Sequence, residues 1–209
     1  MTVRQGRNAG ETSISGPRMP DFPPLYILRH GQTHWNAEHR VQGQLNSPLT
    51  DLGHRQAAEQ HRILSGRDLT GFRFLSSPQG RAFQTAAIAL EGLAMRIDTD
   101  SRLAEITVGE YEGRRRAELP DGGAADESEE SALHLYDSAP GGEGFAGLRA
   151  RCAAFLDDLK GPSVLVTHGM TSRMLRLILL DRDMSEMGAL PGGQGVVYYL
   201  EQGVQHRLT

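Results

Sequence analysis

Apolar residues along this chain gather in short runs, which alternate with longer stretches whose apolar positions repeat at helical spacing. The predicted strands are residues 24–28, 72–75, 95–98 as a candidate edge strand, 163–167, 196–200 and 204–208. The predicted helices are residues 50–64, 79–93, 143–159 and 170–180. This alternation predicts an α/β fold, a three-layer α/β/α sandwich around a largely parallel central sheet.

Two segments depart from this pattern, one in the middle of the chain and one at its start. Residues 113–142 are charged and glycine-rich, and we expect them to form a small cap insertion that folds over the site. Residues 1–20 are polar and lack the apolar centre of a secretory signal, so we expect a disordered N-terminal tail. The remainder, residues 21–209, is expected to form one domain.

Composition then narrows the class of protein. The 209 residues carry a formal net charge of −4, which argues against general nucleic-acid binding. No apolar stretch reaches the ~18 residues of a membrane span, so we expect no membrane association either. The single cysteine, Cys152, lies in an amphipathic stretch and is predicted to fill the core, with a reactive thiol as the alternative. A chain without an internal disulfide fits a reducing compartment, and we expect a cytoplasmic location.

The candidate chemistry lies where predicted strands end. The polar residues that follow these strands, open the next helix or lie in the following loop are Arg29, His30, Arg81, Glu105 and His168. Parallel strands place their carboxyl ends on one side of a sheet, where ligands bind in open α/β folds. We therefore expect two arginines, two histidines and one glutamate to converge. An imidazole can act as a nucleophile, and arginine can hold phosphate oxygens in bidentate geometry.

Taken in order, these motifs resemble those of the histidine phosphatase superfamily, in the branch related to phosphoglycerate mutase. The matching segments are Leu28-Arg29-His30-Gly31-Gln32-Thr33 with Asn36, Pro48-Leu49-Thr50, Ser76-Ser77-Pro78 with Arg81, Leu103 with Glu105, and Thr167-His168-Gly169. The resemblance covers about residues 24–200. The chain departs from the family pattern at Gln32, where glutamate is common, at Gly144, where a serine often follows Gly-Glu, and at Met170, where a small residue is common.

The resemblance implies a phosphoryl transfer that needs no metal and no cofactor. His30 would attack phosphorus and become a phosphohistidine, and Glu105 would protonate the leaving alcohol before serving as the base for water. A glutamate is normally ionised at neutral pH, so this role requires phosphate charge and partial burial to disfavour the carboxylate. His168 is implied as the third catalytic residue. The residues implied to bind the phosphate are Arg29, Asn36, Arg81 and Gly169.

The residues leave alternatives open. Glu110 and Glu112 compete with Glu105 as the acid, and the spacing of His30 and His34 would suit a metal on a helix. We expect hydrolysis of a small phosphorylated metabolite, with mutase activity or a non-catalytic phosphate-binding module as alternatives. Residues 117–143 contain no lysine or arginine. We expect this acidic cap to disfavour a bisphosphate and to suit a small or uncharged leaving group.

Overall fold

Six strands form one sheet in the computed structural model, which describes residues 22–120 and 129–209. The strands are β1 Leu25–Arg29, β2 Arg73–Ser76, β3 Asp98–Thr99, β4 Ser163–Thr167, β5 Val197–Glu201 and β6 Val204–Leu208. Their order across the sheet is β3-β2-β4-β1-β5-β6. The first four strands run parallel, whereas β5 is antiparallel to both β1 and β6.

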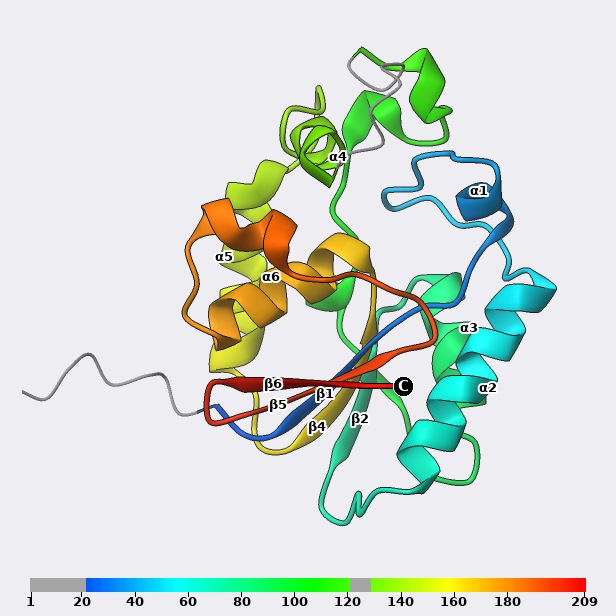
Figure 1. Ribbon diagram of the computed structural model, residues 1–209, viewed down its shortest axis with the longest axis vertical. Helices are drawn as coiled ribbons and strands as arrows, with labels where there is room; N and C mark the ends of the chain where they lie inside the picture. Colours follow the sequence, from blue (N-terminus) through cyan, green and yellow to red (C-terminus); the bar gives the residue numbers. More distant parts are fainter. Residues whose placement is uncertain (1–21, 121–128) are drawn as a thin grey trace, which may run out of the picture.

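Helices cover both faces of this sheet. The α-helices are α1 His34–Ala37, α2 Asp51–Ser65, α3 Gly80–Ala89, α4 Glu129–Asp137, α5 Gly144–Asp157 and α6 Gly169–Leu179. The 3₁₀ turns are η1 Ser101–Leu103, η2 Gly109–Tyr111, η3 Arg116–Glu118 and η4 Met184–Ala189. Figure 1 shows α2 and α3 on one face and α5 and α6 on the other, with α1 and α4 together at one end of the molecule.

Alternate residues of the central strands divide between two hydrophobic cores. Ile27 and Leu165 pack with residues of α5 and α6, whereas Leu28 and Val166 pack with residues of α2 and α3. This division follows from the pleat, which points successive side chains of a strand to opposite faces. The predicted three-layer α/β/α sandwich with a largely parallel sheet is therefore confirmed.

Two predicted boundaries near the edge of the sheet were wrong. β3 contains only two residues and lies later than the predicted strand 95–98, because Met95 is fully exposed and makes no ladder pair with β2. The predicted helix 79–93 ends at Ala89, after which Gly92 turns the chain with φ of +69°. Both errors fall at the ends of elements, where periodicity carries little information.

The described part of the predicted cap contains η3 and α4. Residues 121–128 of the cap and the predicted tail 1–20 lie outside the described residues. Cys152 is fully buried on α5, and burial raises the pKa of its thiol to about 12. The prediction that Cys152 fills the core, rather than acting as a reactive thiol, is therefore confirmed. Across residues 22–120 and 129–209, no helix has the length and apolar character needed to cross a membrane.

The loop after β1 packs directly on the first turn of α2. A Cβ atom added to Gly31 would overlap the backbone of Gly53, and one added to Gly53 would overlap the carbonyl of Gln32. Thr50 N donates to Gln32 O at 2.9 Å, and Thr50 Oγ1 accepts from Gly53 N at 3.1 Å, which caps the helix. The start of α2 therefore fixes the loop that contains His30.

We expect Gly53→Ala to lower the free energy of unfolding by about 1–3 kcal/mol, because the added methyl group forces α2 away from Gln32. At an unconstrained helix position, the same change would stabilise the protein by up to ~1 kcal/mol. Chemical denaturation measures the difference. Ala58→Gly, at an exposed site of the same helix, reports the effect of helix propensity alone. A Gly53→Ala variant at least as stable as the wild type would contradict the close approach.

Candidate functional site

The carboxyl ends of β1 and β4 bring two histidines side by side. In the parallel pairing of these strands Arg29 lies opposite Thr167, and His30 N donates to Thr167 O at 2.9 Å. His168, the residue after β4, therefore comes next to His30, with ring centroids 5.2 Å apart. Both rings are buried.

The environment of His30 defines which ring nitrogen is reactive. Its Nδ1 lies 2.7 Å from the carbonyl oxygen of Gly31, and since a carbonyl can only accept, Nδ1 carries the proton. Nε2 keeps its lone pair and accepts from Arg81 Nε at 3.3 Å. Burial lowers the pKa of His30 well below its ordinary value of 6.5, and the positive charges of Arg81 and Arg29 lower it further. The free site therefore presents a neutral imidazole at neutral pH.

His168 lies beside His30 and is held by Ser77, the residue that follows the neighbouring strand β2. Its Nε2 is 2.8 Å from Ser77 Oγ, and that oxygen also accepts from Gln79 N at 3.2 Å. Its Nδ1 is buried and has no hydrogen-bond partner among the described residues. Burial lowers the pKa of His168 well below 6.5, with Arg81 as the next cause. Sequence reasoning included Ser77 in the Ser76-Ser77-Pro78 motif at the end of a strand but gave it no role in the site.

Arg81 opens α3 and is almost completely buried. Its guanidinium donates to the backbone carbonyls of Leu45 and Gly43, the latter at 2.8 Å, in addition to His30. Burial lowers the pKa of Arg81 to about 10, so the side chain stays protonated at neutral pH. None of the ion pairs in the described part of the chain involves Arg81, and its charge is available to a bound anion.

Arg29 is the second cation of the site and likewise forms no ion pair with another described residue. Its Nε is buried without a hydrogen-bond partner in residues 22–120 and 129–209. A Cβ at Gly169 would lie 3.3 Å from Arg29 Cζ, so glycine makes room for the guanidinium there. Asn36 also lines the site, with its Oδ1 occupied by Thr33 and by Gln194 Nε2 at 3.2 Å. Because the Asn36 oxygen is occupied, the Asn36 amide nitrogen is the atom that can donate a hydrogen bond to a ligand in the cavity.

Glu105 is 8% exposed and lies against the N-terminus of α6. Its Oε1 accepts from the backbone of Ile106 at 3.0 Å and from the amide and hydroxyl of Thr171 at 3.2 Å each. Its Oε2 accepts only from Met170 N, at 3.2 Å. The positive end of the helix dipole favours a carboxylate at this place. Oε2, which has a single donor, is the oxygen left for proton transfer.

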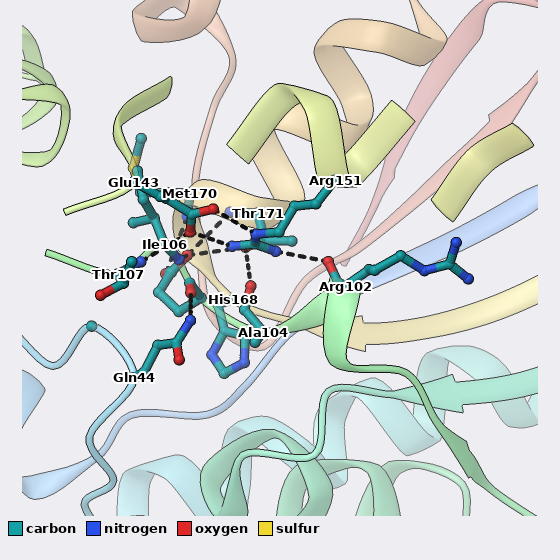
Figure 2. Close-up of polar contacts among 12 residues, drawn as sticks. Gln44, Arg102, Ala104, Ile106, Thr107, Glu143, Arg151, His168, Met170 and Thr171 are labelled. Atoms are coloured by element: carbon teal, nitrogen blue, oxygen red, sulfur yellow. Dashed lines mark hydrogen bonds and ion pairs between the residues drawn. The ribbon is translucent and has the colours of Figure 1, made fainter. Parts of the chain in front are cut away.

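A partly buried ion pair between Glu143 and Arg151 holds the loop that contains Glu105, and Figure 2 draws the contacts of this pair with the segment from Arg102 to Thr107. Glu143 and Arg151 form a bidentate pair with both donor–acceptor distances at 2.9 Å. Glu143 Oε1 also accepts from Thr107 N at 3.0 Å, and Arg151 donates to the carbonyl of Arg102 at 2.7 Å. The pair therefore fixes the chain three residues before and two residues after the carboxylate. Sequence reasoning did not assign a role to either residue.

The surroundings of this pair bear on the departure at Gly144 and on the two other candidate acids, Glu110 and Glu112. Gly144, where the family often has serine, adopts φ of +63°, a left-handed conformation that glycine adopts freely and that costs other residues roughly 1–2 kcal/mol. Glu110 is exposed, and the Oε1 of Glu112 accepts from backbone amides and from Thr107. Among the three glutamates, Glu105 alone lines the cavities described below.

The metal alternative finds no support in the geometry. His34 is exposed on α1, whereas His30 is buried. No group of three or more histidine, cysteine, aspartate or glutamate side chains within the described ranges is placed to hold a metal ion.

Two adjoining cavities open over these residues. The histidine cavity, about 300 Å³, is lined by residues that include His30, Asn36 and Arg81. The side cavity, about 190 Å³, runs along the start of α6 and is lined by Gly169, Met170 and Arg173 among others. The residues shared by both cavities are Arg29, Glu105, Arg116 and Tyr136. Sequence reasoning missed the last two, which come from the predicted cap. His168 is not among the lining residues of either cavity, although its ring lies beside that of His30.

Known proteins share this sequence pattern. The family model described as histidine phosphatase superfamily (branch 1) matches residues 25–207. Among curated relatives, the probable phosphoglycerate mutase GpmB of Yersinia pestis (strain Pestoides F) is 35% identical over 166 residues. This match covers 75% of the present chain and 74% of that protein.

Solved structures share the fold as well. A mycobacterial glucosyl-3-phosphoglycerate phosphatase in complex with VO3 is 31% identical, with a TM-score of 0.71 over 86% of this chain and 92% of its own. The alpha-ribazole phosphatase of Shigella flexneri is 25% identical, with a TM-score of 0.72 over 87% of this chain and 93% of its own. Similar proteins therefore carry the names of both phosphatases and mutases.

The lowered pKa values of His30 and His168 predict that acid destabilises the protein. In the unfolded chain both imidazoles take up a proton near pH 6.5, whereas in the folded protein they stay neutral to lower pH. The contribution of the two neutral histidines to the free energy of unfolding is therefore complete above pH 6.5 and is lost as the pH falls below it. Between pH 7.5 and pH 5.5 in phosphate-free buffer, we expect a loss on the order of 1 kcal/mol for each histidine. Denaturant unfolding at the two pH values measures this loss.

The matched comparison uses two histidine variants. His168→Asn should reduce the pH dependence, whereas His54→Asn, at an exposed position of α2, should leave it unchanged. An unaltered slope in the His168 variant would show that this ring does not stay neutral in the folded state.

Proposed function

Because the chain belongs to the histidine phosphatase superfamily (branch 1), we propose that it is a phosphomonoester hydrolase. It acts through a phosphohistidine on a small phosphorylated metabolite. The observation that carries the proposal is the state of His30, whose buried ring keeps a lone pair on Nε2 beside the guanidinium of Arg81. No metal and no cofactor take part in this proposal, because Arg29 and Arg81 supply the positive charge that a metal would provide.

The first step transfers the phosphoryl group to the protein. His30 Nε2 attacks phosphorus, so the N–P bond forms while the bond from phosphorus to the leaving oxygen breaks. Glu105 takes part in this step in its protonated form, which the negative charge of the bound phosphoryl group favours. Its Oε2 gives the proton to the leaving oxygen, and the alcohol leaves without charge. Arg29 and Arg81 stabilise the charge on the phosphoryl oxygens, with Asn36 as a neutral donor.

His168 supports this step through its unpartnered nitrogen. Ser77 Oγ already accepts from Gln79 N, and we assign its hydroxyl proton to the hydrogen bond with His168 Nε2. The imidazole then carries its own proton on Nδ1, which lacks a partner among the described residues. This N–H group can donate a hydrogen bond to an oxygen of the phosphoryl group that His30 carries.

The second step returns the protein to its starting state. Glu105, now a carboxylate, takes a proton from water, and the water oxygen attacks phosphorus. The N–P bond breaks, its electron pair returns to His30 Nε2, and inorganic phosphate leaves. Gly169 makes room for the guanidinium of Arg29, which holds the phosphate oxygens in this proposal.

Mutase-type transfer is the second candidate, favoured by the names of the curated relatives. It would use the same phosphohistidine but return the phosphoryl group to a bound intermediate rather than to water. A non-catalytic binding module is disfavoured, because a binder needs no buried carboxylate such as Glu105 beside the nucleophile. Release of inorganic phosphate, as opposed to isomerisation of the substrate, distinguishes the first two candidates.

Trapping the phosphoprotein tests the proposal most simply. Brief reaction with labelled substrate in the presence of EDTA, followed by quenching, should place acid-labile phosphate on His30. His30→Ala should lose essentially all turnover and all label, whereas His54→Ala should keep both. Label on serine or aspartate, or activity that disappears with EDTA and returns with a divalent metal, would overturn the mechanism.

The role of Glu105 is tested by comparing leaving groups. Glu105→Gln should slow hydrolysis of an alkyl phosphate by ~10²–10⁴-fold, the usual contribution of a general acid. It should slow p-nitrophenyl phosphate far less, because that leaving group needs little protonation. Glu110→Gln, an exposed carboxylate of the same segment, should change neither rate. Equal loss on both substrates in the Glu105 variant would remove this residue from proton transfer.

A further inference from the structure

Gln79 lies between the Ser76-Ser77-Pro78 motif and Arg81, and the sequence motifs give it no role. It is partly buried and is the N-cap residue of α3. The side chain of an N-cap residue ordinarily accepts from the first amides of its own helix. Within α3, all of which the structure describes, no amide donates to the Gln79 side chain, and Asn46 Oδ1 accepts from Arg81 N at 3.0 Å instead. The side chain of Gln79 is therefore used elsewhere.

The side-chain amide of Gln79 bridges two loops that are distant in the sequence. Its Oε1 accepts from the backbone nitrogen of Glu105 at 2.7 Å, and its Nε2 donates to the carbonyl oxygen of Gly43 at 3.1 Å. These partners fix the orientation of the amide, because a backbone N–H can only donate and a carbonyl can only accept. The amide is therefore a spacer of fixed length between the loop of Gly43 and the loop of Glu105.

Each end of this bridge bears on a residue of the proposed reaction. The carbonyl oxygen of Gly43 also accepts from Arg81 Nη2 at 2.8 Å, so one oxygen is shared by Gln79 and the guanidinium that binds the phosphoryl group. The other end is the backbone of Glu105, the proposed acid. Arg81 and Glu105 are thus connected through Gly43 and the two hydrogen bonds of Gln79.

The backbone of Gln79 gives the bridge a fixed starting point. Its nitrogen donates at 3.2 Å to Ser77 Oγ, the atom that holds His168. Its carbonyl oxygen accepts from Ala82 N at 2.9 Å and from Phe83 N at 3.0 Å, which joins it to the first turn of α3. Because the backbone is held on both sides, the position of the side-chain amide follows that of α3.

Gln44 makes a second and longer contact with the backbone of the acid. Among the described residues, it is the other side chain that bonds this backbone, and its Nε2 donates to Glu105 O at 3.4 Å from an exposed position. The contact from Gln79 is shorter and comes from a partly buried side chain. We therefore expect Gln79 to have the larger influence on where Glu105 lies.

The substrate makes the spacing of these residues important. The oxygens that Arg81 binds and the leaving oxygen that Glu105 protonates are attached to the same phosphorus atom, so that phosphoryl group sets the productive separation of the two side chains. A misplacement of about 1 Å can cost ~10²-fold in rate. We propose that Gln79 is a positioning residue, whose side-chain amide sets Glu105 against the phosphoryl group that Arg81 holds. This inference rests on the proposed hydrolase function and adds a residue to it.

Two substrates with different leaving groups test this role. The measured quantity is the kcat/KM for glycerol 3-phosphate divided by that for p-nitrophenyl phosphate, because only the first leaving group needs a proton. Gln79→Met keeps the length of the side chain and removes both hydrogen bonds. We expect it to lower the ratio by about tenfold or more, a part of the ~10²–10⁴-fold contribution of a general acid. Gln79→Asn should also lower the ratio, because its shorter amide cannot reach both partners.

A second background shows whether the effect passes through the acid. When Glu105→Gln has already lowered the ratio, adding Gln79→Met should not lower it further, because the group that Gln79 positions is absent. Gln84→Met, at an exposed site of α3, should keep the wild-type ratio. Since each ratio is internal to one variant, partial unfolding of a variant cancels.

The outcomes separate the inference from the function on which it rests. If Glu105→Gln lowers the ratio but Gln79→Met and Gln79→Asn keep it at the wild-type value, the inference is wrong and the proposed function stands. The same holds if Gln79→Met lowers the ratio as much in the Glu105→Gln background as in the wild type. If Glu105→Gln leaves the ratio unchanged, or neither phosphomonoester is hydrolysed, the inference and the proposed mechanism are both overturned.

Discussion

β1 and β4 pair in parallel, and this register decides where each reactive side chain lies. It sets Arg29 opposite Thr167, so the two residues that follow, His30 and His168, leave the sheet side by side. It also starts α6 directly behind His168, which aims the amides of that helix at Glu105. A register shift of one residue would send alternate side chains to the opposite face and dismantle both the cores and the site.

Burial and charge then act on this arrangement together. Desolvation of His30 disfavours its protonated form, and the nearby guanidinium groups of Arg81 and Arg29 disfavour it further. The same arginines form no ion pair within the described part of the chain, and Glu105 offsets their positive charge only in part. A phosphoryl dianion compensates that charge while it meets a neutral nucleophile. Affinity for the anion and reactivity of the imidazole therefore have one origin.

The sequence was sufficient to predict the layers of the fold and the convergence of the two histidines, because strand ends in a parallel sheet share one edge. It could not predict contacts that depend on distant segments. The pairing of Glu143 with Arg151 spans about two turns of α5, and it contacts a loop that lies 36 to 49 residues away in the sequence. The position of Arg116 over the site depends on how the cap folds back, which no local periodicity encodes. The predicted helix end near residue 93 and the predicted edge strand at 95–98 were wrong for a simpler reason, because periodicity carries little information at the ends of elements.

The stereochemical outcome at phosphorus tests the central claim of a phosphohistidine most directly. A phosphorothioate monoester made chiral with one heavy oxygen isotope can be hydrolysed in water enriched in another, and the configuration of the released thiophosphate determined. Each in-line displacement inverts phosphorus. Attack by His30 followed by attack by water therefore predicts net retention. Net inversion would mean that water attacks the substrate in a single step, and it would contradict the role of His30 as a nucleophile.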